Sequence, residues 1–107
     1  MSTIPTPILQ IVNQVFDMEK KLEKGNAPTS IKRNIRRIKS SLEDMGIHYH
    51  NPIGEAYKET RTDVEATISG NFSHRMFITE VIKPIITKRE GNLQQIVQNG
   101  VVIVEAK

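Results

Sequence analysis

The chain has 107 residues, which is enough for one small domain but supplies little apolar material for a large core. Hydrophobic residues make up 37% and aromatic residues 5%, so we expect some apolar surface to be buried against a partner or a second copy. The 15 basic residues only slightly outnumber the 12 acidic ones, a weaker bias than dedicated nucleic-acid-binding domains carry, and the absence of cysteine excludes disulfides and thiolate chemistry.

Residues 1–7 contain neither the basic cluster nor the apolar run of a secretory signal peptide. The longest apolar runs, such as residues 101–104, are far too short to cross a bilayer. We therefore expect a cytoplasmic protein with no membrane partner.

Two amphipathic helices are predicted in the first 46 residues. An apolar stripe at steps of three and four residues starts with Leu9, Val12 and Phe16 and continues to residue 24. A second stripe, ended by Gly46, is formed by Ile31, Ile35, Ile38, Leu42 and Met45.

A helical hairpin cannot enclose a core alone, so we expect two copies to join their hairpins into a four-helix bundle. The residues of the two stripes would then be the dimerisation contacts. The alternative interpretation is that the stripes pack on the chain's own strands.

From residue 47 onward the sequence changes to short alternating segments that are typical of strands. Six strands are predicted, at residues 47–50, 63–69, 76–82, 85–87, 93–98 and 101–104. The predicted fold class is α+β: an antiparallel helical hairpin, forming a dimeric four-helix bundle, followed by a small, mostly antiparallel β domain. We place the boundary at Gly46, with residues 1–46 as the dimerisation module and 47–107 as the partner-binding domain.

Motifs for catalysis or metal binding are weak. His48 and His50 share one face of a predicted strand, with His74 as a candidate third ligand, but no carboxylate or cysteine stands at ligand spacing. Nothing fixes the geometry of the carboxylates, which we interpret as solvated loop residues: Glu55, Glu59, Asp63 and Glu65. We expect no catalytic residue, no metal and no cofactor, and therefore not an enzyme.

The second predicted helix carries a basic face, formed by Lys32, Arg33, Arg36, Arg37 and Lys39. Doubled in a dimer, this face could neutralise several phosphates, which leaves a basic-helix nucleic-acid-binding protein as an alternative function. Such charges also solvate the outside of a helical hairpin and pair with its acidic residues. No aromatic residues for base stacking are interleaved with them, so we favour the solvated face and do not expect nucleic acid as the partner.

Several short motifs follow one another along nearly the whole chain. They are Pro7-Ile8-Leu9-Gln10-Ile11-Val12-Asn13-Gln14-Val15, Leu42-Glu43-Asp44-Met45-Gly46-Ile47, Asn51-Pro52-Ile53-Gly54-Glu55-Ala56-Tyr57, Val64-Glu65-Ala66, Ile78-Thr79-Glu80-Val81-Ile82 and the closing residues 101–107. In this order they resemble the GrpE-like nucleotide exchange factors of DnaK-type chaperones, in a divergent form without the long paired N-terminal helix.

The resemblance implies a homodimeric co-chaperone whose β domain binds a DnaK-like ATPase and stabilises its open nucleotide cleft. It also leaves room for an interaction module that kept the fold and lost exchange activity. Where the family carries an Arg-x-Ile-Arg run, with an arginine that contacts the chaperone, this chain has residues 95–98, and two basic residues stand in the neighbouring turn. We therefore expect partner binding at Ile82, Lys88, Arg89, Gln95 and Gln98.

Overall fold

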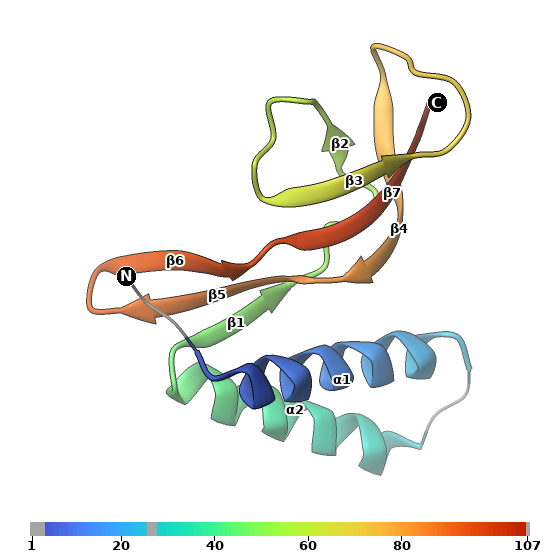
Figure 1. The fold of residues 1–107 in the computed structure, drawn as a ribbon. Coiled ribbons are helices and arrows are strands. Elements are labelled where there is room, and N and C mark those ends of the chain that lie inside the picture. The colour runs from blue at the N-terminus through green and yellow to red at the C-terminus, as the bar shows by residue number, and fades with distance from the viewer. Residues whose placement is uncertain (1–3, 26–27, 107) are drawn as a thin grey trace.

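The structure is a computed structural model that describes residues 4–25 and 28–106. Two helices are followed by seven strands (Figure 1). The helices are α1 (Thr6–Glu23) and α2 (Thr29–Asp44). The strands are β1 (Ile47–His50), β2 (Ala56–Tyr57), β3 (Val64–Ile68), β4 (Met76–Lys83), β5 (Ile85–Glu90), β6 (Leu93–Gln98) and β7 (Gly100–Ala106). Neither described helix combines the length and apolar character that crossing a membrane requires.

The turn from α2 into β1 depends on Gly46. Its φ angle is +80°, a left-handed conformation that side chains disfavour. A Cβ atom at this position would also lie 2.6 Å from the backbone oxygen of Arg89, whose own N–H donates to the Gly46 oxygen at 2.7 Å. Glycine is therefore needed where the helical hairpin meets β5.

The strands form two sheets, and two nearly continuous segments of the chain, β4–β5 and β6–β7, pass from one sheet to the other. The smaller sheet has the order β1-β5-β6, and the larger has the order β2-β4-β7-β3. Only Pro84 separates β4 from β5, and only Asn99 separates β6 from β7, so both connections pass directly from one sheet to the other. Pairing is antiparallel except between β3 and β7, which run parallel.

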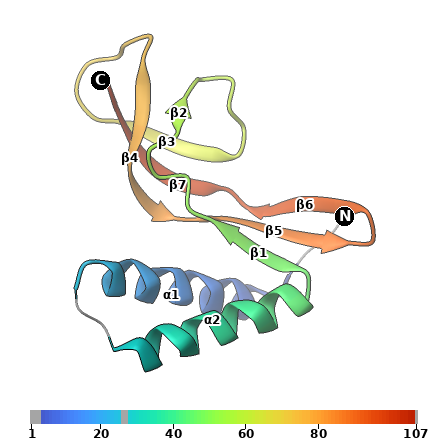
Figure 2. The same cartoon turned by 180° about the vertical axis from the view of Figure 1, so that it is seen from behind.

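The helical hairpin lies along the smaller sheet, and the larger sheet extends away from it (Figures 1 and 2). The molecule is flat, with extents of 41 × 40 × 22 Å. Two hydrophobic clusters contain residues from both sides of the domain boundary predicted at Gly46, and they join helices to strands. One places Phe16 among residues of the larger sheet and Ile85, and the other places Val12 and Leu42 against Ile47 and Ile86.

The predicted fold class is wrong. The chain forms two helices and seven strands in two sheets, and not a four-helix bundle followed by a β domain. The physical reason is that the chain's own strands cover much of the apolar stripe that the prediction assigned to a second copy. Phe16 is 2% exposed and Val12 is fully buried, both within one chain.

Strands lie at all six predicted segments, and two features of the sheets were not predicted. A seventh strand, β2, pairs only two residues with β4, which is too short for an alternating pattern to reveal it. In addition, β5 continues to Glu90 and the turn falls at residues 91–92, because Arg89 and Glu90 pair with β6 instead of turning.

Candidate functional site

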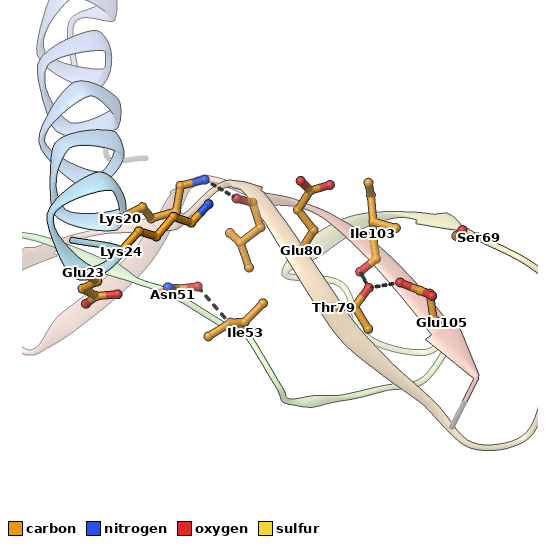
Figure 3. Close-up of a pocket in the computed structure, with 11 residues that line it drawn as sticks. Lys20, Glu23, Lys24, Asn51, Ile53, Ser69, Thr79, Glu80, Ile103 and Glu105 are labelled. Carbon is orange, nitrogen blue, oxygen red and sulfur yellow. Dashed lines mark hydrogen bonds between the residues drawn. The ribbon is translucent and has the colours of Figure 1, made fainter.

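A groove of about 610 Å³ lies between the end of α1 and the larger sheet (Figure 3). We call it the α1–sheet groove. Lys20 and Glu23 line it from α1, Lys24 from the position directly after α1, and Ile53 from the loop after β1. The opposite side comes from β4, β7 and the residue after β3, with Thr79, Glu80, Val81, Ile103, Glu105 and Ser69; Asn51 completes the lining.

Lys20 anchors α1 to the edge of this groove. Its Nζ donates to the Val81 backbone oxygen at 2.8 Å and lies 3.9 Å from the Asp17 carboxylate. The same ammonium lies 4.9 Å from the centre of the Phe16 ring, which is close enough for a cation–π interaction. The charge of Lys20 is therefore already used within the chain.

The strand side of the groove carries two carboxylates. Glu105 accepts a hydrogen bond of 2.6 Å from the Thr79 hydroxyl. Among the described residues, neither Glu80 nor Glu105 has a basic partner within 4 Å. Ile53, which lines the same groove, is 50% exposed, so the groove offers both apolar and acidic surface.

A second charged site lies on the loops around β2, and it includes two of the acids predicted to be solvated, Glu55 and Asp63. Arg61 donates to Asp63 at 2.6 Å, to Glu55 at 2.7 Å and to the Ala56 backbone oxygen at 3.1 Å. The other oxygen of the Glu55 carboxylate contacts Nε2 of His50. The sequence signal is ambiguous, since both Lys58 and Arg61 have acidic neighbours at short spacing.

These contacts shift the titration of the carboxyl groups. Partial burial raises the pKa of Glu55, but hydrogen bonds and positive charge from Arg61 and His50 outweigh burial, so its pKa is lowered. The hydrogen bond from Arg61 likewise lowers the pKa of Asp63, against a smaller opposing effect of burial. Hydrogen bonding to Asp63 raises the pKa of Arg61 in turn. Glu55, Arg61 and Asp63 are therefore charged near neutral pH, and we call these three residues the Arg61 clamp.

A third polar contact ties the helices to β1. The Tyr49 hydroxyl donates to Glu19 at 2.9 Å, and the Lys39 ammonium donates to the same carboxylate at 3.2 Å. Burial, followed by the hydrogen bond to Glu19, raises the pKa of Tyr49 above its usual range. One of the five predicted surface cations thus belongs to an internal contact.

The five residues predicted for partner binding do not form one site. Ile82 is 50% exposed on β4, and Arg89 is exposed on β5. Lys88 and Gln95 are paired across β5 and β6, and the Lys88 ammonium donates to the Met45 backbone oxygen at 2.5 Å.

Gln98 is occupied by internal hydrogen bonds. Its side chain exchanges hydrogen bonds of 3.0 and 2.9 Å with Asn13 and also donates to the Pro84 backbone oxygen. It therefore fastens the end of β6 to α1. Partner contact at the five positions stays a prediction, with Ile82 and Arg89 the most available of them.

The predicted dimerisation residues divide into two groups. Val12, Phe16, Ile35 and Leu42 are at most 6% exposed within the single chain, and the half-buried Leu9 packs beside them. The other three remain exposed at 37% to 48%: Ile31, Ile38 and Met45. The alternative of packing on the chain's own strands therefore accounts for one part of the stripe only.

The histidines and the basic helix face add little chemistry. In residues 4–25 and 28–106, no three His, Cys, Asp or Glu side chains are placed to hold a metal ion. His50 pairs with Glu55, and the His74 ring lies against Phe72 on the loop before β4. The remaining cations of α2 are exposed: Lys32, Arg33, Arg36 and Arg37.

Comparison with family models, with curated proteins and with solved structures found no match to this chain.

Proposed function

We propose that this chain is a GrpE-like, non-catalytic binding partner of a DnaK-type ATPase and promotes nucleotide exchange by stabilising the open nucleotide cleft. Support comes from the motifs in collinear order along the sequence. Further support comes from the order of the observed elements, in which two helices precede short strands in two sheets.

The observation that carries the proposal is the apolar surface of the strands and their loops. Among the described residues of this part, six large apolar side chains are 40% to 66% exposed: Ile53, Ile68, Phe72, Ile82, Leu93 and Ile96. Single exposed apolar residues are ordinary, but this many in so small a chain supply the contact area that a protein partner requires.

The proposed mechanism needs no acid, base or nucleophile from this chain. A protein that binds the open cleft more tightly than the closed one shifts the ATPase towards the open state. Each tenfold preference for the open state contributes about 1.4 kcal/mol to that shift. ADP then leaves faster because its contacts with the closed cleft are lost.

We further propose a homodimer. In the described part of the helical hairpin, five large apolar side chains are exposed: Ile11 and Met18 on α1, Ile31 and Ile38 on α2, and Met45 directly after α2. On each helix these side chains recur every seven residues, so they lie along one face of that helix. In this proposal a second copy covers these apolar faces, because burying exposed apolar surface lowers the free energy in water.

The exposed cations of α2 support a second candidate function, nucleic-acid binding. Its signature is affinity that falls steeply with salt, because bound phosphates release counterions. Affinity for duplex or single-stranded nucleic acid that falls by orders of magnitude between low and moderate salt would favour this candidate.

The leading proposal is tested by calorimetric titration of the cognate DnaK-type ATPase domain, nucleotide-free or saturated with ATP. We expect tighter binding to the nucleotide-free domain, and weaker binding by Ile82→Asp, which places a charge on exposed apolar surface. Thr67→Asp, on an exposed position of β3, is the matched control. Equal affinity for both states of the ATPase would contradict the proposal.

A further inference from the structure

We propose that the α1–sheet groove binds a basic segment of the partner, with a cationic side chain against Glu80 and Glu105 and an apolar side chain on Ile53 and Ile103. The inference rests on the proposed function and names the chemistry of the partner segment.

The strand side of the groove has a repeating pattern of acid and apolar groups. Glu80 of β4 is paired with Ile103 of β7, and Glu105 follows two residues later on the same face of β7. An isoleucine therefore lies between two carboxylates on neighbouring strands, and Figure 3 shows all three side chains along one side of the groove. A peptide that alternates basic and apolar side chains matches this pattern.

The charges of the groove are not balanced within the chain. Lys20 is held by the Val81 oxygen and Asp17, while Glu23 and Lys24 line the α1 side with one charge of each sign. Glu80 and Glu105 keep their negative charges without a basic partner among the described residues. Glu80 stands opposite Ile103 and Glu105 opposite Phe77, so the two carboxylates lie on adjacent strands without facing each other. A cation from outside can therefore approach both carboxylates.

The volume of the groove and the negative charge of its strand side indicate what kind of segment it binds. A volume of about 610 Å³ exceeds the space that one side chain fills, so a short stretch of chain fits better than a single inserted residue. The two carboxylates repel phosphate, so the strand side of the groove disfavours nucleic acid. A peptide segment with a basic and an apolar side chain can contact both the isoleucines and the carboxylates of the groove.

The test uses the full chain and the cognate DnaK-type ATPase domain as the probe. The double variant Glu80→Gln with Glu105→Gln removes both charges and keeps an oxygen that can accept the Thr79 hydrogen bond. We expect its Kd to rise about tenfold at low salt, because the charge pairs with the partner are lost. Its Kd should also depend less on salt than that of the wild type, because fewer charge pairs remain for salt to screen. Glu65→Gln, an exposed acid on β3 outside the groove, should leave the Kd unchanged.

The outcomes separate the two proposals. If the wild type binds the ATPase and the double variant binds equally well, the groove is not the basic-segment site although the proposed function stands. If the wild type does not bind, both proposals fail. Ile53→Lys provides a second route, because a cation on this exposed loop position should also weaken binding, and normal affinity in that variant would overturn the groove as the site.

Discussion

Arg61 shows how much of this small structure depends on a few polar side chains. Its guanidinium group joins Glu55 before β2 to Asp63 before β3, and it is only 19% exposed. In a chain with little apolar material, such a clamp fixes loops that a hydrophobic core does not reach. The residue has a structural role that composition alone does not reveal.

The clamp predicts a dependence of stability on pH. The pKa values of Glu55 and Asp63 are lower in the folded state than their ordinary values near 4, so the unfolded chain binds more protons in that region. The stabilisation is therefore complete above about pH 5 and is lost as the pH falls through the folded pKa values. Urea unfolding at a series of acidic pH values measures the loss.

Arg61→Ala should flatten this acid dependence, and Arg33→Ala, at an exposed position of α2, should leave it unchanged. An acid dependence in Arg61→Ala as steep as that of the wild type would show that other carboxyl groups are responsible.

Two glycines with the same backbone conformation allow a matched test of the turn into β1. Gly46 and Gly54 both have φ of +80°, but a Cβ would clash only at Gly46, where the Arg89 oxygen lies 2.6 Å away. Gly54→Ala should cost about 1 kcal/mol of unfolding free energy, as expected for a left-handed residue. Gly46→Ala should cost clearly more, because β5 must also move, and equal costs in thermal or urea unfolding would refute the role of the close approach.

At the scale of elements, the helices could be predicted from sequence better than their packing. The spacing of apolar residues identified both helices and six of the seven strands. It could not show which surface covers the stripes, because a second copy and the chain's own strands satisfy the same periodicity. The bent connections at Pro84 and Asn99, which bring the two sheets together, also have no local sequence signature beyond a turn.

Phe16 tests whether helices and sheets share a core. Its ring packs in the cluster that contains Met76, Ile78 and Val104 of the larger sheet. Phe16→Ala should lower the free energy of unfolding by about 3 kcal/mol or more. Gln14→Ala, on the exposed side of the same helix, should have little effect, and the opposite ranking would contradict the shared core.

At the scale of the whole molecule, the candidate surfaces were only partly accessible to prediction. Ile82 and Arg89 lie exposed as a binding role requires, whereas Gln98 is held by Asn13 and Pro84. The α1–sheet groove was not predicted, because its walls come from residues up to 85 positions apart in the sequence, from Lys20 to Glu105, and only folding brings them together.

The homodimer is tested by sedimentation. The wild type should have about twice the mass of one chain, and Ile38→Asp should yield a folded monomer, because a charge on the exposed helix stripe opposes its burial. Ser40→Asp, at an exposed position of the same helix, should remain dimeric. A wild-type protein that sediments as a monomer would contradict the proposed dimer.

The release of a fluorescent ADP analogue from the cognate DnaK-type ATPase, followed by stopped flow, tests the central claim most directly. We predict that the release rate increases with the concentration of this protein and reaches a plateau, because binding to the open cleft saturates. A release rate that is unchanged at saturating protein would contradict the proposed exchange function.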